Sequence, residues 1–144
     1  MSAKEPIFRA GIIPFVIEAD GTARYMFMKP SDPDFGGPDW QMAKGRVEND
    51  DDNYTTAIRE GREELGLKES NIIEVIELGV FLGRTCVFIC HVRDKNDFDP
   101  FDDETGDVIW LTLEEFQQIG RKIHRHILVS AETYVNITTL VGTC

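Results

Sequence analysis

The sequence predicts a mixed fold, α/β in the α+β arrangement, with a mixed β-sheet sandwiched between helices. Short apolar segments rich in β-branched residues alternate with one strongly periodic helix, as expected for a sheet that helices cover. Glycine-containing turns join neighbouring strands into hairpins, and hairpins exclude a purely parallel sheet. The 144 residues contain no internal repeat and no low-complexity linker, so we expect a single domain over residues 1–144.

The first elements are a hairpin and a loop. Residues 8–18 are apolar and β-branched and predict a strand, which a proline interrupts. An Asp-Gly pair then predicts a turn, and residues 24–29 predict the returning strand. Three prolines and two glycines place residues 30–39 in a loop, after which residues 40–43 predict a short strand.

Residues 54–65 predict the clearest helix of the chain. Apolar residues recur there at about 100° per residue and give the helix one buried face. These residues are Tyr54, Ala57, Ile58, Gly61 and Leu65. Asp52 or Asn53 can cap the start of the helix, and Gly66 suits the left-handed position just after its end.

The second half predicts three strands and two helices. Residues 72–81 and 85–92 form a strand pair that turns at Gly83, and residues 107–111 form a further strand. Thr112 and Glu115 have the spacing of a capping box, which opens a helix that ends at residue 119. A last helix is expected from about residue 121 to about residue 140.

Composition and charge exclude several classes of protein. The net charge of −11 argues against extended nucleic-acid binding, which needs a basic face, but permits a small anionic substrate bound with cations. The longest apolar stretch, residues 11–17, is too short to span a membrane, and the N-terminus lacks the pattern of a signal peptide. We therefore expect a cytoplasmic protein without membrane contact. Cys86 and Cys90 lie four apart on one predicted strand, where we interpret both as small buried apolar residues.

Three glutamates on the 54–65 helix indicate a cation site. Glu60, Glu63 and Glu64 stand at i, i+3 and i+4, which places them on neighbouring positions of one helix face. Carboxylates so placed repel one another, and a hard divalent cation such as Mg²⁺ would turn this repulsion into binding. The alternative is an exposed face with salt bridges, for example between Arg59 and Glu63.

The residues around this trio resemble a known motif. Residues 45–67 read GRVENDDDNYTTAIREGREELGL, which resembles the Nudix box, Gly-x5-Glu-x7-Arg-Glu-U-x-Glu-Glu-x-Gly-U, where U is a bulky aliphatic residue. The matching residues are Gly45, Arg59, Glu60, Glu63, Glu64, Gly66 and Leu67. The resemblance implies a Nudix fold, a mixed sheet between helices in which the box forms a loop–helix–loop, and a hydrolase that cleaves phosphoanhydride bonds.

The resemblance also implies roles for individual residues. Glu60 and Glu64, with Glu63 close by, would hold one or more Mg²⁺ ions, with Mn²⁺ as the alternative metal, and the Gly45 carbonyl would complete the coordination. Arg59 would orient a glutamate. The general base would be Glu60 or Glu63 or, as in some relatives, an acid from a later loop, for which Glu104 is the candidate.

Two positions depart from the family pattern. Asp51 stands where the box has a glutamate, and because its side chain is shorter we expect its contacts to need a water or a shifted loop. Gly61 stands at an aliphatic position, which costs about 1 kcal/mol relative to alanine in a helix. We expect a larger residue elsewhere to fill the space that Gly61 leaves.

The segment before the box bears on the substrate. Trp40 to Gly45, WQMAKG, resembles the W-x-x-P-K-G segment of Nudix enzymes acting on dinucleoside polyphosphates, RNA 5′ ends or diphosphoinositol phosphates, with alanine in place of the proline. Lys44 could contact a phosphate, as could Arg9 and Lys29 on the early strands. Trp40 could stack on a base, although a tryptophan more often packs into the core.

Several substrates and one other class of function remain open at this point. Dinucleoside polyphosphates are the first choice, followed by nucleoside triphosphates, nucleotide sugars and RNA 5′-pyrophosphates. A non-catalytic Nudix-fold module that binds a nucleotide or a partner protein is the alternative, and an isopentenyl-diphosphate isomerase is disfavoured because the necessary cysteine and histidines are not identifiable. The basic residues 121–126 are interpreted as offsetting nearby acids, with contact to a terminal phosphate or a nucleotide base as the alternative. Homodimer formation stays open, because many relatives dimerise but no interface stripe stands out.

Overall fold

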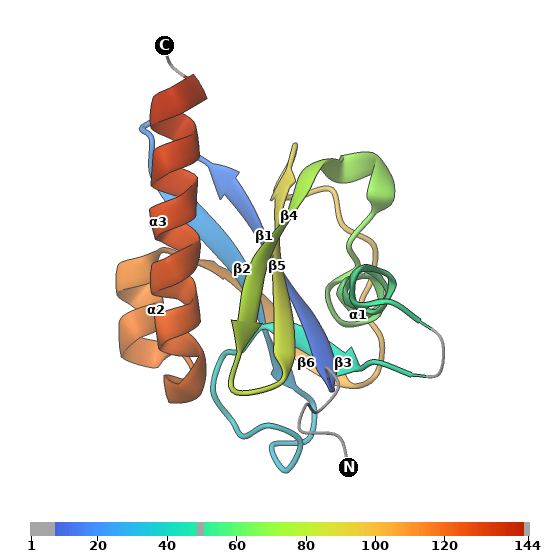
Figure 1. The fold of residues 1–144 in the computed structure, drawn as a ribbon. Helices are drawn as coiled ribbons and strands as arrows, with labels where there is room; N and C mark the ends of the chain where they lie inside the picture. Colours follow the sequence, from blue (N-terminus) through green and yellow to red (C-terminus); the bar gives the residue numbers. More distant parts are fainter. Residues whose placement is uncertain (1–7, 49–50, 143–144) are drawn as a thin grey trace, which may run out of the picture.

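The computed structural model describes the backbone of residues 8–48 and 51–142, and their side chains up to Ile137. Six strands in this part of the chain form one mixed sheet with the order β4-β5-β1-β2-β6, and β3 pairs with β1 (Figure 1). The strands are β1 (Arg9–Ile17), β2 (Ala23–Pro30), β3 (Ala43–Arg46), β4 (Ile72–Phe81), β5 (Thr85–Val92) and β6 (Thr105–Leu111). The helices are α1 (Asn53–Leu65), α2 (Leu113–Ile119) and α3 (Arg125–Gly142), with short 3-10 turns η1 (Glu69–Asn71) and η2 (Lys122–His124).

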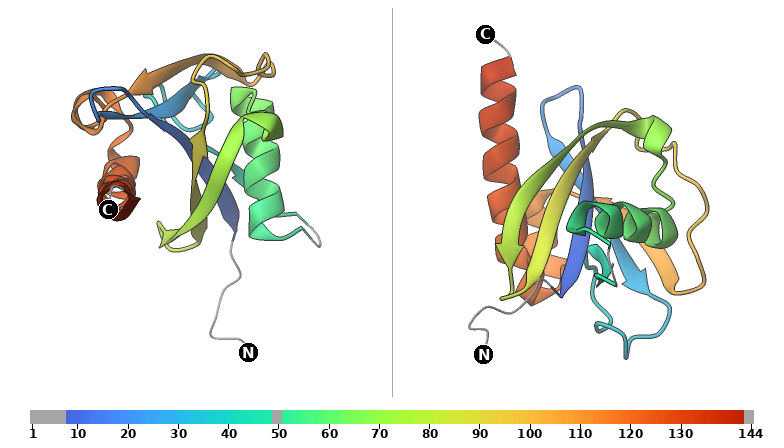
Figure 2. Two further views of the ribbon diagram at one scale, coloured as in Figure 1. Left: turned by 90° about the horizontal axis from the view of Figure 1, so that it is seen from above. Right: turned by 45° about the vertical axis from the view of Figure 1, so that its right-hand side comes forward.

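The sheet is mixed, as predicted, because β1 and β5 run parallel while the other pairs are antiparallel. Helix α1 covers one face of the sheet, and α2 and α3 lie on the other (Figures 1 and 2). Side chains alternate between the two faces: Ala10 and Ile12 of β1 pack in the α1 layer, whereas Ile13 and Phe15 pack toward α2 and α3. The predicted layered α+β fold is confirmed.

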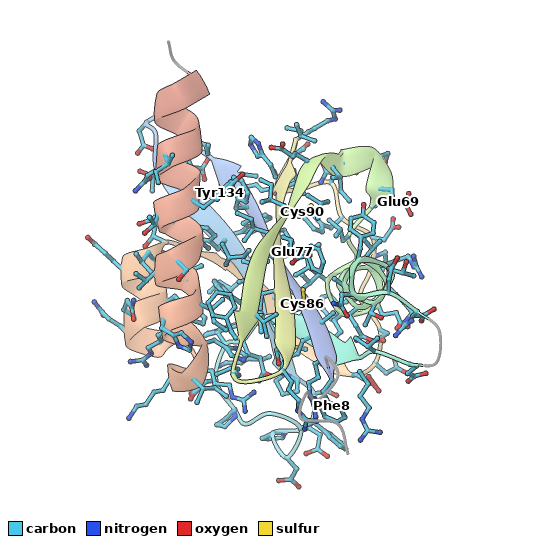
Figure 3. All side chains as sticks on the ribbon, viewed as in Figure 1. Phe8, Glu69, Glu77, Cys86, Cys90 and Tyr134 are labelled. Atoms are coloured by element: carbon cyan, nitrogen blue, oxygen red, sulfur yellow. The ribbon has the colours of Figure 1, made fainter. Side chains whose placement is uncertain are left out.

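The two cysteines of β5 are buried on the α1 face (Figure 3). Cys86 and Cys90 are four residues apart, which is two full alternations of the strand, so their side chains point the same way. Burial raises the pKa of the Cys90 thiol to about 12. The interpretation of both residues as small core side chains is confirmed.

Helix α1 begins and ends where its flanking residues predict. The Asp52 side chain accepts a hydrogen bond from the Thr55 N–H at 2.6 Å, so Asp52 and not Asn53 is the cap. Gly66 has φ 77° and donates to the Arg62 carbonyl, which closes the last turn. No helix in the described part of the chain is both long and apolar enough to cross a membrane.

The space left by Gly61 is filled from two sides. A β-carbon at residue 61 would lie 2.9 Å from Cγ2 of Ile12 and 3.0 Å from Cδ2 of Leu67. These distances are shorter than ordinary van der Waals contacts, so the two side chains occupy the volume that the family's aliphatic residue would take. The expected filling of this gap is confirmed.

Some boundaries differ from the predictions. Residues 40 and 41 form only isolated bridges, and the strand expected at 40–43 lies at Ala43–Arg46 because these residues pair with the start of β1. Helix α3 begins at Arg125, since the preceding residues form the turn η2. The predicted capping box of α2 is present. The Thr112 N–H donates to Oε1 of Glu115 at 2.8 Å, and the Glu115 N–H donates to Oγ1 of Thr112 at 3.2 Å.

Candidate active site

Two carboxylates of α1 lie directly against strand β3. The backbone N–H of Lys44 donates a hydrogen bond to Oε1 of Glu64 at 3.2 Å. The backbone of Gly45 approaches Glu60 so closely that a β-carbon at residue 45 would overlap the Glu60 carboxyl group. A larger residue at position 45 would therefore force the Glu60 carboxyl group to move away from the strand.

Glu60 and Glu64 share a weakly hydrated site. The Glu60 side chain is only 16% exposed. Burial raises the pKa of both carboxyl groups, the charge of Glu63 adds to the effect at Glu60, and the charge of Glu60 adds to the effect at Glu64. A pair of carboxylates held together in this way favours a bound cation, which would compensate both the burial and the repulsion.

Arg59 joins α1 to the loop that precedes it. Its Nη1 atom lies 2.7 Å from Oδ2 of Asp51, and its Nη2 atom lies 3.7 Å from Oε2 of Glu60. Because the ion pair is direct, the contact of Asp51 with Arg59 needs no bridging water, and the shifted loop stays a prediction. The Asp51 N–H donates to the Glu48 carbonyl at 3.0 Å, which helps to hold Asp51 beside Arg59.

The loop before β6 is fastened to the last turn of α1. The Thr105 hydroxyl donates to the Glu64 carbonyl at 2.9 Å, and a backbone N–H of the loop donates to the Glu63 carbonyl at 2.8 Å. Glu104 immediately precedes Thr105, and its charge contributes to the raised pKa of Glu60. The structure thus brings Glu104 to the same region as the carboxylates of α1.

The metal donors implied by the sequence come from two elements, α1 for the glutamates and β3 for the Gly45 carbonyl. Within residues 8–48 and 51–142, no three His, Cys, Asp or Glu side chains converge tightly enough to form a ready-made metal site. All the implied donors are oxygens, which are the ligands that Mg²⁺ and Mn²⁺ prefer.

An open cleft of about 750 Å³ lies beside these carboxylates, within the size range of small-molecule sites. The predicted site residues that line it are Arg9, Lys44, Glu64 and Glu104. The other predicted site residues lie outside its lining: Lys29, Trp40, Gly45, Arg59, Glu60 and Glu63. The Nζ atom of Lys29 lies 4.6 Å from the centroid of the half-buried Trp40 ring, so these two side chains contact each other. Substrate contact by either one stays a prediction.

A group of cationic side chains forms one wall of the cleft. Oε1 of the buried Gln41 accepts hydrogen bonds from Nζ of Lys44 at 3.2 Å and from Nη1 of Arg121 at 3.4 Å. Burial, together with the charges of Arg121 and Arg9, lowers the pKa of Lys44 to about 8. These three cations are therefore close neighbours in a chain whose net charge is −11.

Arg121 lines the cleft, although the sequence analysis preferred the other interpretation of its basic cluster. We expected it to offset nearby acids, but its backbone N–H donates to the Trp40 carbonyl at 2.7 Å and its side chain lines the cleft. A parallel bridge between Trp40 and Gly120 holds it there. Because this contact joins segments 80 residues apart, no local pattern in the sequence announces it.

The arrangement suits a polyanion bound together with a cation. Glu64 lies on the side of α1, and Lys44, Arg9 and Arg121 supply positive charge in the same cleft. Cationic side chains bind phosphate oxygens, whereas paired carboxylates reject a bare phosphate and accept one that arrives with a divalent ion.

Comparison with known proteins identifies the family. Residues 8–131 match the model of the NUDIX domain. A mutT/nudix family protein from Listeria innocua is similar in structure, with a TM-score of 0.73 and 22% identity over 96% of this chain and 99% of the other. An Ap4A hydrolase from C. elegans, solved as a binary complex, has a TM-score of 0.70 at 18% identity and covers 89% and 96% of the two chains. The NUDIX domain of Shewanella oneidensis NrtR, complexed with ADP ribose, has a TM-score of 0.67 at 15% identity over 92% and 90%.

No curated protein matches the chain significantly. At these identities, the likeness to solved structures establishes the fold. The family match covers most of the chain, including the box, the carboxylates of α1 and the basic wall of the cleft. The chain therefore belongs to the Nudix family and is a Nudix hydrolase, an enzyme of the class that acts on phosphoanhydride bonds.

Proposed function

We propose that this protein is a Mg²⁺-dependent pyrophosphohydrolase that cleaves nucleoside diphosphate-linked substrates, with dinucleoside polyphosphates as the first choice. The observation that carries the proposal is a cleft whose lining contains both acidic and basic side chains. Glu64 and Glu104 supply the negative charges, and Lys44 and its arginine neighbours supply the positive ones. Such a cleft provides for both partners of a metal–polyphosphate complex.

A divalent cation fits the residues present. The half-buried carboxyl groups of Glu60 and Glu64 have raised pKa values because burial desolvates them; the charge of Glu63 adds to the effect at Glu60, and the charge of Glu60 adds to the effect at Glu64. We infer that these two groups hold the ion, with Glu63 and the Gly45 carbonyl as further donors, and Mn²⁺ is the alternative to Mg²⁺. When bound, the ion neutralises phosphate charge and makes a water more acidic.

The cationic wall would bind and orient the polyphosphate. Lys44 and Arg121 are held by the same Gln41 oxygen, so their positive charges are fixed before the substrate arrives. A positioned pair of cations reduces the entropy lost when a flexible phosphate chain is aligned for attack. Arg9 lines the same cleft and extends this positive surface.

A carboxylate would accept the proton of the attacking water. Water oxygen bonds to phosphorus, the bridging P–O bond breaks, and the proton passes to the base. Glu60, Glu63 and Glu104 are the candidates, and we favour Glu104 among the residues outside the box. Its backbone is fixed, since its N–H donates to Oδ1 of Asp102 at 3.0 Å and its carbonyl accepts from the Ser31 N–H at 2.8 Å.

Dinucleoside polyphosphates remain the first choice of substrate. The WQMAKG segment supports this choice, and an Ap4A hydrolase is among the structurally similar proteins. Nucleoside triphosphates, nucleotide sugars and RNA 5′-pyrophosphates are the next candidates. We further propose a cytoplasmic location, as the sequence predicts, and leave a homodimer as a testable option.

A substrate panel with product identification tests this proposal. The panel contains diadenosine polyphosphates, nucleoside triphosphates, nucleotide sugars and 5′-triphosphate RNA, each with Mg²⁺ and with chelator. Highest kcat/KM on a diadenosine polyphosphate, with Arg121→Gln raising KM, is the expected result. Failure of every compound to turn over, together with a rise in melting temperature on adding a nucleotide, would instead favour the non-catalytic binding module.

A further inference from the structure

Three exposed apolar side chains meet at the cleft although they come from three separate segments. Phe35 of the β2–β3 loop is 75% exposed, Leu82 of the β4–β5 turn is 44% exposed, and Ile123 of η2 is 45% exposed. All three line the cleft that holds Lys44 and Glu64. Figure 1 shows the three segments at the same end of the molecule. Single exposed apolar residues are ordinary, but a convergent set beside a charged cleft indicates a binding surface.

The backbone at Leu82 strengthens this inference. Among the described residues, Leu82 is the only non-glycine residue with a positive φ, at 54°, and it is followed by Gly83 with φ 83°. Asparagine or glycine is favoured in this conformation, and a leucine there is disfavoured by sterics as well as by its exposure to water. Leucine at this position is unfavourable both because it is exposed to water and because of its backbone conformation. Such a residue indicates a function beyond the formation of the turn.

The aromatic rings near the cleft are not equally available to a ligand. The Phe8 ring has the guanidinium carbons of Arg9, Arg46 and Arg84 within 4.9–5.0 Å of its centroid (Phe8 is labelled in Figure 3). Arg84 and Phe8 are held together further, since the Phe8 N–H donates to the Arg84 carbonyl at 2.9 Å. Phe35, by contrast, is three-quarters exposed and lines the cleft, so its ring can stack on a planar group.

Gln41 connects the loop that carries Phe35 to the basic wall. Nε2 of Gln41 donates to the Gly36 carbonyl at 3.2 Å, next to Phe35, while Oε1 accepts from Lys44 and Arg121. A ligand that matches both surfaces has a polyanionic part and a flat apolar part. A nucleotide has both parts, whereas inorganic polyphosphate and inositol phosphates lack the flat apolar one.

We propose that Phe35, Leu82 and Ile123 form the subsite for the nucleobase of the substrate, with Leu82 as its fixed wall. The inference rests on the proposed function, in which the polyphosphate of the substrate binds Lys44, Arg9 and Arg121. It makes Leu82 a specificity-determining residue that acts on the base and not on the phosphates.

Leu82→Asn tests the proposal, because asparagine suits the turn but not an apolar base. We expect an unchanged or higher melting temperature, an unchanged kcat, and a KM for the nucleotide substrate raised about fivefold. Phe35→Ala should raise KM about tenfold through loss of stacking. Inorganic tripolyphosphate, which has no base, should inhibit both variants and the wild type with the same inhibition constant. Val80→Thr, an exposed residue of the same hairpin outside the cleft lining, is the matched control and should leave KM unchanged.

The outcomes separate this inference from the proposed function. Turnover with an unchanged nucleotide KM in both variants overturns the nucleobase subsite and leaves the hydrolase intact. If the wild type hydrolyses nothing in the panel, the proposed function fails. Calorimetric measurement of ADP and tripolyphosphate binding then tests whether the nucleobase subsite exists. Weaker ADP binding by Leu82→Asn with unaltered tripolyphosphate binding supports the subsite, and equal loss for both ligands, or none, overturns it.

Discussion

Replacing His124 with glutamine should change how the stability of the fold depends on pH. The His124 ring is 2% exposed, and its Nδ1 atom accepts a hydrogen bond from the Met42 N–H at 3.4 Å. Burial lowers the pKa of His124 from 6.5 to about 3, and the positive charges of Lys44 and Arg121 act in the same direction. The folded state therefore keeps this imidazole neutral at pH values where the unfolded chain protonates it.

The magnitude follows from the two pKa values. Above pH 6.5 both states are neutral at this residue, and its stabilising effect is fully present. As the pH falls from 6.5 toward 3, the unfolded state alone binds the proton, so the free energy of unfolding decreases. At about pH 5 the loss is about 2 kcal/mol, which corresponds to a decrease in melting temperature of roughly 4–8 °C.

Urea unfolding of wild type and His124→Gln at pH 7 and pH 5 measures this effect. Glutamine retains an acceptor for the Met42 N–H but does not titrate, so the variant should lose about 2 kcal/mol less than wild type between the two pH values. Carboxylates that titrate in the same range cancel in the difference. Gln118→Ala, an exposed substitution that removes no titratable group, is the control and should keep the wild-type slope. Identical pH dependence in His124→Gln and wild type would refute the reasoning.

Two further predictions concern the carboxylate site. Gly45→Ala should displace Glu60, because the new β-carbon overlaps its carboxyl group, and should reduce kcat about 10- to 100-fold. A circular dichroism melt checks that the variant is folded. Undiminished turnover would show that catalysis does not depend on the position of Glu60. Asp51→Asn should weaken the 2.7 Å ion pair that holds Arg59 beside Glu60 and reduce Mg²⁺-dependent turnover about tenfold, whereas Asp51→Glu should retain the ion pair and the turnover. Equal activity in wild type and both variants would show that Asp51 has no role in the site.

The elements predicted correctly have local causes. The cap at Asp52, the left-handed Gly66 and the capping box of α2 each depend on residues within a few positions of one another, so sequence spacing suffices to predict them. The burial of Cys86 and Cys90 on one face follows from strand alternation in the same way. Glu60, Glu63 and Glu64 are grouped by helical spacing alone.

The features that could not be predicted depend on contacts between distant segments. The shift of β3 to Ala43–Arg46 follows from its register with β1, and register is set by the packed sheet. Arg121 enters the cleft because its backbone binds Trp40, and Lys29 turns to the Trp40 ring instead of lining the cleft. The direct Asp51–Arg59 pair depends on where the backbone of Asp51 is held, which side-chain length alone does not indicate.

The most direct test of the proposed function compares Mg²⁺-dependent hydrolysis by wild type, Glu64→Gln and Glu114→Gln on the best substrate of the panel. Glu64 lies in the cleft, bound to the Lys44 N–H, whereas Glu114 is exposed on α2 and outside the cleft lining. We predict that Glu64→Gln loses about 100-fold or more in kcat/KM while Glu114→Gln matches wild type. Wild-type turnover in a folded Glu64→Gln protein, or turnover that persists in chelator, would contradict the account.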